Sequence, residues 1–131
     1  GTALPTRHFL PAAKVIGAEP KGADDAYRSF VSGERVTTQT PQTVCDGLRT
    51  TLSQRTFDLI RANVDEIRTA EEATIIRAMR LIWERLKIVV EPSSCTPLAA
   101  ILEQPEAFAG RRVGVILTGG NVDLEKLPWH S

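Results

Sequence analysis

Apolar residues follow two patterns along this chain: short continuous runs, and longer stretches in which they recur every three or four residues. Continuous runs bounded by polar or breaking residues are typical of strands buried on both faces. Such runs occupy 14–18, 64–67, 88–91 and 113–118, with a shorter β-branched run at 36–38. Helical spacing occupies 2–12, 23–32, 53–63, 69–87 and 97–104. Because strands and helices alternate, the sequence predicts an α/β fold with a twisted, mostly parallel sheet flanked by helices.

The clearest helical pattern begins at Thr69. Thr69 to Glu72 has the form of a capping box, in which the hydroxyl accepts from a helical N–H and the glutamate reaches back. The apolar face that follows consists of Ile75, Ile76, Met79, Ile82, Trp83 and Leu86. We interpret this face as core packing rather than as a ligand-binding stripe. For the helix expected at 97–104, Ser93 or Ser94 is the predicted N-cap.

Composition and charge narrow the class of protein. The 131 residues suffice for one domain. Sixteen basic residues balance sixteen acidic ones, which argues against electrostatic binding of nucleic acid. No apolar run approaches the roughly 18 residues that span a bilayer. Cys45 and Cys95 are too few and too far apart for a disulfide scaffold or a zinc site, so we expect reduced thiols in a cytoplasmic protein.

Three polar segments directly follow apolar runs, at 19–25, 91–95 and 118–121. In an open α/β sheet, ligands bind at the carboxyl ends of the strands. In the third segment, the Thr118 hydroxyl precedes Gly119 and Gly120, whose backbone leaves room for a flat ring. The same residues also fit an ordinary tight turn between a strand and a helix.

The other two segments also have two interpretations each. Glu19 and Asp25 offer oxygen ligands for a hard cation such as Mg²⁺ or Ca²⁺. Alternatively, Asp24 and Asp25 favour the N-terminus of the next helix through its dipole. Glu91 is either an acceptor at the edge of a ring or a charge at the end of a strand.

Five motifs containing these segments occur in a definite order. They are VIGAEPKGADDA at 15–26, DGL at 46–48, TFDLIR at 56–61, WERLKIVVEPS at 83–93 and GVILTGGNVDL at 114–124. In this order they resemble the serine racemases and the related serine/threonine dehydratases, over nearly the whole chain. These are pyridoxal-phosphate enzymes with the tryptophan-synthase-β-like fold, also called fold type II.

The resemblance implies a binding site for the ring of pyridoxal 5'-phosphate. In that family the hydroxyl before Gly-Gly-Asn binds the pyridine nitrogen, which places this role on Thr118, with Gly119 beside it. Gly47 is then expected to lie against the ring. A hydroxyl is a neutral partner and does not hold the ring nitrogen protonated as a carboxylate would.

The resemblance also implies a cation site and a weaker effector site. Racemase-like members bind a divalent cation such as Mg²⁺ through two carboxylates and a carbonyl, which here are Glu19, Asp25 and the carbonyl of Ala23. Asn121 matches a position near the nucleotide effector site of the animal racemases.

The implied activity is that of an ammonia-lyase acting on serine, threonine or 3-hydroxyaspartate, or of a serine racemase. The intact enzyme is expected to be a cytoplasmic homodimer that binds a small hydroxy amino acid and neither nucleic acid nor membrane. The alternative is a non-catalytic regulatory module or pseudo-enzyme with the same sheet.

Some features of the family pattern are missing from this chain. The family attaches its cofactor to a lysine in a Ser-x-Lys-x-Arg motif, whereas Lys14, Lys21, Lys87 and Lys126 have other surroundings. The glycine-rich phosphate loop is also missing, and the first residues already have a helical pattern without an initiator methionine. We therefore expect residues 1–131 to be the C-terminal part of the cofactor-binding large domain, inactive alone. Ser94 and Cys95 also replace the small residues that are common in the family after Glu-Pro-Ser, so the substrate preference stays open.

Overall fold

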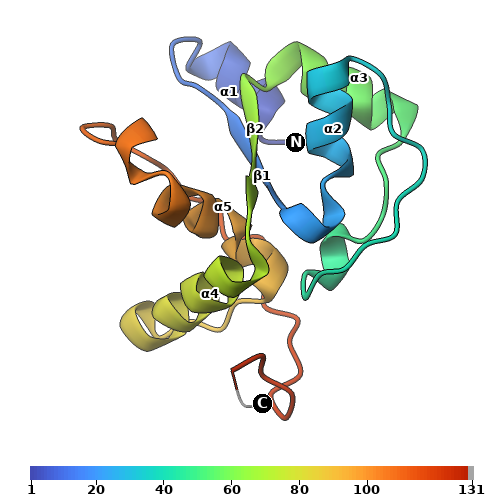
Figure 1. Cartoon of the computed structure of the whole chain (residues 1–131). Coiled ribbons are helices and arrows are strands. Elements are labelled where there is room, and N and C mark those ends of the chain that lie inside the picture. Colours follow the sequence, from blue (N-terminus) through green and yellow to red (C-terminus); the bar gives the residue numbers. More distant parts are fainter. Residues whose placement is uncertain (130–131) are drawn as a thin grey trace.

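Two parallel strands lie at the centre of the fold, between two groups of helices (Figure 1). A computed structural model describes residues 1–129. Strand β1 (Ile16–Pro20) pairs with β2 (Glu66–Ala70), so that Ile16 lies opposite Glu66 and Pro20 lies opposite Ala70. The α/β class and the parallel pairing predicted from the sequence are confirmed.

Helices cover this pair of strands on both sides. Helix α5 (Pro92–Glu103) packs against both strands and against α4 (Glu72–Leu86). Helix α2 (Asp25–Ser32) packs against β2 and against α3 (Gln54–Asn63), and α1 (Ala3–Phe9) packs against α3. Short 3₁₀ turns occupy Lys21–Ala23, Asp46–Leu48 and Pro105–Ala107. No helix in the described part of the chain is long and apolar enough to cross a membrane.

The main core lies between α4 and α5. Ile75, Met79 and Ile82, spaced by three or four residues, are buried in the core cluster together with Cys95 and Ala99 of α5. The predicted apolar face of α4 is therefore the core face. Its last member, Leu86, remains 60% exposed because it lies at the end of the helix.

Local signals account for several helix ends. The side chain of Ser53 accepts from the N–H of Thr56 and caps α3, with a distance of 3.2 Å. Helix α2 ends at Gly33, whose φ of 78° is a left-handed conformation that glycine adopts without steric cost.

The predicted capping box does not form. Thr69 belongs to β2 and pairs with Glu19, so it is not free to begin a helix. Helix α4 begins three residues later, after Glu71, which makes no side-chain cap. The Glu72 carboxylate instead accepts from the main-chain N–H of Val44 at 2.9 Å, a contact with a distant segment.

The expected start of the last helix is also wrong. Helix α5 begins at Pro92, not near Pro97, so Ser93 and Ser94 lie within its first turn and neither is its N-cap. Pro97 lies inside the helix and cannot donate to the carbonyl of Ser93. That carbonyl accepts from the hydroxyl of Thr96 at 3.1 Å instead, which explains how the helix tolerates this proline.

Three of the predicted strands, at 36–38, 88–91 and 113–118, do not form within residues 1–129. A strand requires a hydrogen-bonded neighbour, and these segments pair with none of the described strands. Val113, Val115 and Ile116 remain 37–51% exposed, although their apolar run is typical of a strand buried on both faces. A single main-chain hydrogen bond, from Glu91 N to the carbonyl of Gly119 at 3.1 Å, connects the two later segments.

Candidate functional site

The first turn of α5 lies between the two segments expected to contact the ring. On one side, a Cβ atom built on Gly47 would lie 3.2 Å from Ser93 Oγ. On the other side, Ser94 Oγ lies 3.2 Å from Thr118 Oγ1 and also contacts Gly119. The structure therefore brings Gly47, Thr118 and Gly119 to neighbouring serines of one helical turn.

Ser94 holds the turn at 118–119 through both main-chain polar groups of Gly119. The N–H of Gly119 donates to Ser94 Oγ at 2.8 Å, and Ser94 Oγ donates to the Gly119 carbonyl at 2.7 Å. Ser94 is only 1% exposed, so water does not compete for these hydrogen bonds. Because Gly119 follows Thr118 directly, this contact holds Thr118 next to the first turn of α5.

The start of α5 is encoded by the dipeptide Glu91-Pro92. Pro92 occupies the first helical position, where its fixed φ suits a helix and its missing N–H costs no hydrogen bond. Glu91 precedes it in an extended conformation and donates its N–H to the Gly119 carbonyl. The two polar strand ends predicted from the sequence are therefore adjacent in space.

The glycines after Thr118 pack closely against the chain itself. A Cβ on Gly119 would lie 2.5 Å from Glu91 Oε1, and a Cβ on Gly120 would lie 2.6 Å from the carbonyl oxygen of Val89. Both positions therefore need glycine, because a side chain would clash with residues 89–91. The Glu91 carboxylate lies beside the turn, and neither interpretation of its role is decided by this position.

The exposed side of this arrangement suits a planar group with a polar edge. Thr118 and Gly47 are both exposed, whereas Ser94 beneath them is buried. Ser93 Oγ is buried and has no hydrogen-bond partner among residues 1–129, which leaves an unsatisfied donor and acceptor beside Gly47. An orphaned hydroxyl, a side-chain-free position and an accessible threonine hydroxyl fit the ring of the expected cofactor.

A second group of polar residues lies at the carboxyl end of β1. The carboxylate of Glu19 accepts from the N–H groups of Tyr27 at 2.7 Å and Ala26 at 3.3 Å, in the first turn of α2. Asp25 is 2% exposed, and its Oδ2 accepts from Leu52 N at 3.1 Å. This segment therefore contributes to the N-terminus of α2, which is one of the two interpretations drawn from the sequence.

Burial of the Glu19 carboxyl raises its pKa to about 7. Main-chain hydrogen bonds from Tyr27 and Ala26 lower this pKa, while the negative charges of Asp25 and Asp24 raise it. No cluster of three or more histidine, cysteine or carboxylate side chains suited to a metal occurs in the described residues. A cation here would rely on two carboxylates, a carbonyl such as that of Ala23, and water, a donor set that suits Mg²⁺.

Asn121 and the two cysteines lie outside these two groups of residues. Asn121 is exposed just beyond Gly120, and its expected role near an effector site stays a prediction. Cys45 and Cys95 are free and fully buried, and burial raises the pKa of their thiols to about 11 and about 12. Both thiols are therefore protonated at neutral pH.

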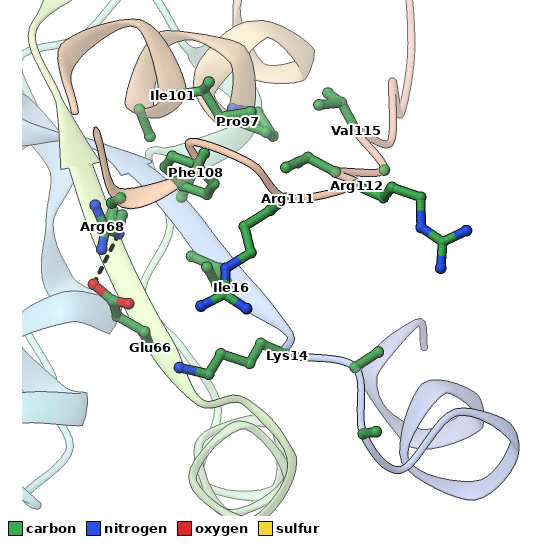
Figure 2. Close-up of a pocket in the computed structure, with 17 residues that line it drawn as sticks. Lys14, Ile16, Glu66, Arg68, Pro97, Ile101, Phe108, Arg111, Arg112 and Val115 are labelled. Carbon is green, nitrogen blue, oxygen red and sulfur yellow. Dashed lines mark ion pairs between the residues drawn. The ribbon is translucent and has the colours of Figure 1, made fainter. Parts of the chain in front are cut away.

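A cavity of about 650 Å³ lies away from these residues (Figure 2). Pro97 and Ile101 of α5 and the β1 residue Ile16 contribute apolar walls, and Val115 borders it from the unpaired 113–118 segment. Lys14 and Arg111 also line it, and Figure 2 shows their side chains among the lining residues. Neither Thr118 nor Gly47 lines this cavity, so it is not the site expected for the ring.

Sequence analysis missed the role of Ser94, which it treated as a possible helix cap. The bond between Ser94 and Gly119 joins residues 25 positions apart, so no local pattern indicates it. A usable signal was nevertheless present. Proline is favoured at the first position of a helix, so Pro92 marks the start of α5 and places both serines in its first turn.

Fold and site together define an α/β chain in which polar groups at the ends of extended segments gather around one helical turn. The chain belongs to the pyridoxal-phosphate dependent enzyme family, whose model matches residues 1–119. The resemblance inferred from the five motifs is confirmed.

Individual relatives narrow the family further. The chain is 55% identical over 130 residues to a beta-hydroxyaspartate dehydratase of Paracoccus denitrificans, covering 99% of this chain and 41% of the relative. It is 47% identical to a serine racemase of Dictyostelium discoideum, covering 97% and 40% respectively. The structure of maize serine racemase superposes with a TM-score of 0.88 at 36% identity, covering 95% of this chain and 39% of that one. The chain thus spans about 40% of the length of these relatives.

The two adjacent serines of α5 give a matched test of the site geometry. Ser94→Ala is expected to lower the free energy of unfolding by about 1–3 kcal/mol, because it leaves the N–H and carbonyl of Gly119 without their partner. Ser93→Ala removes a buried hydroxyl that has no partner among residues 1–129, so it is expected not to lower the free energy of unfolding, because no hydrogen bond is lost. Urea denaturation of both variants measures the difference. Equal effects of the two substitutions would contradict the assigned contacts.

Proposed function

We propose that this chain forms the ring-nitrogen side of the cofactor site of a pyridoxal-phosphate dependent ammonia-lyase. The preferred substrate class is the small hydroxy amino acids, namely 3-hydroxyaspartate, serine and threonine, which are converted to a 2-oxo acid and ammonia. The observation that carries the proposal is the position of the exposed Thr118 hydroxyl, held by Ser94 across one helical turn from Gly47. The relative at 55% identity is itself named a dehydratase of beta-hydroxyaspartate, which favours this substrate.

In this proposal, the residues of this chain position the cofactor ring. When bound, pyridoxal phosphate supplies an electron sink for negative charge that develops at Cα of the amino acid. Thr118 would bind the ring nitrogen through its hydroxyl. Gly119, which has no side chain, would let the backbone next to Thr118 pack closely against Glu91. Gly47 would leave one face of the ring free of a side chain, with Ser93 Oγ available as a hydrogen-bond partner.

A serine racemase is the second candidate function, and the 47% identity to a protein of that name supports it. Both reactions use the same ring-nitrogen partner, so Thr118 has the same role in each. They differ in whether the hydroxyl of the substrate leaves or the α-proton returns on the opposite face.

We further propose that Glu19, Asp25 and the carbonyl of Ala23 bind a divalent cation, with Mg²⁺ the best match to oxygen ligands. Glu19 and Asp25 already accept main-chain hydrogen bonds, but each carboxylate has further lone pairs for a metal. Burial is the largest cause of the raised pKa of Glu19, and the charges of Asp25 and Asp24 raise it further; a cation would offset these charges, which supports the proposal. A cation there would connect the end of β1 to the start of α2.

Product analysis tests the proposed reaction. The natural full-length protein, loaded with pyridoxal phosphate, is expected to release 2-oxo acid and ammonia in equal amounts from 3-hydroxyaspartate. Thr118→Val keeps the shape but removes the hydroxyl, and should lower kcat by about 100-fold. Thr37→Val, at an exposed position outside the site, is the matched control and should retain activity. Serine whose stereochemistry is inverted without 2-oxo acid would indicate the racemase, and no turnover of any substrate would indicate the non-catalytic module.

The cation proposal predicts a pH dependence of stability that Mg²⁺ changes. The folded-state pKa of Glu19 is raised, so its contribution is fully present below about pH 4.5 and is lost as pH rises through about 7. With a chelator present, the free energy of unfolding should therefore fall by about 1–3 kcal/mol between pH 5 and 8. Excess Mg²⁺ should restore stability at pH 8, because it binds the ionised site of the folded state.

Glu19→Gln is the matched variant for this measurement. It should remove most of the fall with pH and also the stabilisation by Mg²⁺, because the amide carries no charge. If Mg²⁺ stabilises the wild type and Glu19→Gln equally, the cation binds elsewhere and the assignment is wrong.

A further inference from the structure

The cavity of about 650 Å³ has extended segments of the chain in its wall. Ile16 and Ala18 of β1 line it, and so do Val113 and Val115 of the 113–118 segment. Figure 2 shows Ile16 and Val115 among the side chains around it. The proposed cofactor and cation sites do not use this cavity, so its role needs a separate explanation.

Strand β1 has an open edge. Within residues 1–129 it belongs to a two-stranded sheet and pairs only with β2. The N–H of Asp65 donates to the Val15 carbonyl at 2.9 Å, which shows that the main-chain groups of Val15 face the β2 side. Because these groups alternate in direction along a strand, those of Ile16 and Ala18 face the opposite edge. An open strand edge of this kind pairs readily with a further strand.

The 113–118 segment is also unpaired. No main-chain hydrogen bond joins it to another main-chain group in the described part of the chain. Val113, Val115 and Ile116 are 37–51% exposed, although their continuous apolar run is typical of a strand buried on both faces. An extended segment in the cavity would pair with β1 and would cover these side chains at the same time.

The charges around the cavity are unevenly distributed. Lys14 precedes β1, Arg111 and Arg112 precede the 113–118 segment, and all three exposed cations line the cavity. The one carboxylate among the lining residues, that of Glu66, is already paired with Arg68 at 2.8 Å. Positive charge therefore gathers at the amino ends of both extended segments, where it would favour a negatively charged group.

We propose that the cavity binds an extended apolar segment of the natural full-length protein, from outside residues 1–131, with an aspartate or glutamate facing Lys14 and Arg111. The relatives named above provide the length for such a segment, since this chain spans only about 40% of them. The inserted segment runs parallel to β1, because sheets with one uniform strand direction are over-represented, and its acidic residue therefore precedes its apolar run.

This inference goes beyond the proposed function and holds whichever reaction the enzyme catalyses. A parallel segment in the cavity would join β1 and 113–118 into one sheet, with their carboxyl ends at a common edge. Glu19 and Thr118, which lie at these two ends, would then share the edge at which α/β sheets bind their ligands.

Zero-length cross-linking of the natural full-length protein tests the occupant and its direction. A carbodiimide joins a lysine amine directly to a carboxylate in contact with it, and mass spectrometry identifies the joined peptides. Lys14 is expected to join an aspartate or glutamate that directly precedes an apolar run outside residues 1–131. The ion pair of Lys21 with Glu71 supplies an internal positive control. Lys14→Arg keeps the charge but removes the amine, so it should lose the first cross-link and retain the second.

Hydrogen–deuterium exchange of the same protein tests the pairing itself. The amides of Ile16, Ala18 and Val115 are expected to exchange as slowly as those of β2. Reversing the charges with Lys14→Glu and Arg111→Glu together should accelerate exchange at Val115 by at least about tenfold, because the amino end of the inserted segment is then repelled. Arg77→Glu changes an exposed cation of α4 that does not line the cavity, and exchange at Val115 should stay within about twofold of the wild type.

Each contrary result overturns a stated part of the proposal. Rapid exchange at Ile16 and Val115 in the wild type overturns the inserted segment. A Lys14 cross-link to a second copy, recognised by mixing isotope-labelled and unlabelled protein, overturns the assignment of the occupant to the same chain. An acidic residue that follows the apolar run overturns the parallel direction, and a Lys14 that forms no cross-link while Lys21 joins Glu71 overturns the charge pairing. None of these readouts depends on turnover, so the proposed function is tested separately.

Discussion

The interaction on which the candidate site depends is the contact of one buried hydroxyl with one glycine. Ser94 Oγ bonds both the N–H and the carbonyl of Gly119, and together with the N–H of Glu91 it attaches an extended segment that belongs to no described strand to the start of α5. Val113, Val115 and Ile116, earlier in the same segment, are exposed and belong to no strand. The position of Thr118 therefore follows from α5, which in turn is fixed by its packing on α4 and on both strands.

The same helix links the two segments that are expected to contact the cofactor ring. Glu91, Ser93 and Ser94 lie at its start, next to the segments that contain Gly119 and Gly47. Sequence alone predicts that such polar strand ends gather, because ligands bind at the carboxyl edge of parallel strands. The structure shows the same gathering with a different cause: side chains of one helical turn connect the segments, without sheet pairing between them.

Local pattern predicted most of the elements and few of the contacts. The spacing of Ile75, Met79 and Ile82 was enough to place α4 and its core face, because helical periodicity depends only on near neighbours. The apolar runs at 88–91 and 113–118 were not enough to predict strands correctly. A strand depends on a hydrogen-bonded partner, which its own residues do not specify. The sequence pattern placed the start of α5 at Pro97, whereas this proline lies inside the helix and the Thr96 hydroxyl donates to the Ser93 carbonyl in its place.

The residues of the candidate site were found through their motifs, whereas the contacts that position them were not. Thr118, Gly47, Glu19 and Asp25 were singled out in advance, but the hydrogen bonds of Ser94 and the capping of α2 by Glu19 connect positions that are distant in sequence or depend on exact geometry. The most direct measurement is a crystal structure of the natural full-length protein with pyridoxal phosphate bound. The account predicts the ring nitrogen within hydrogen-bond distance of Thr118 Oγ1, with both bonds from Ser94 to Gly119 retained. A ring nitrogen paired with another residue, or a Thr118 side chain turned away from the ring, would contradict it.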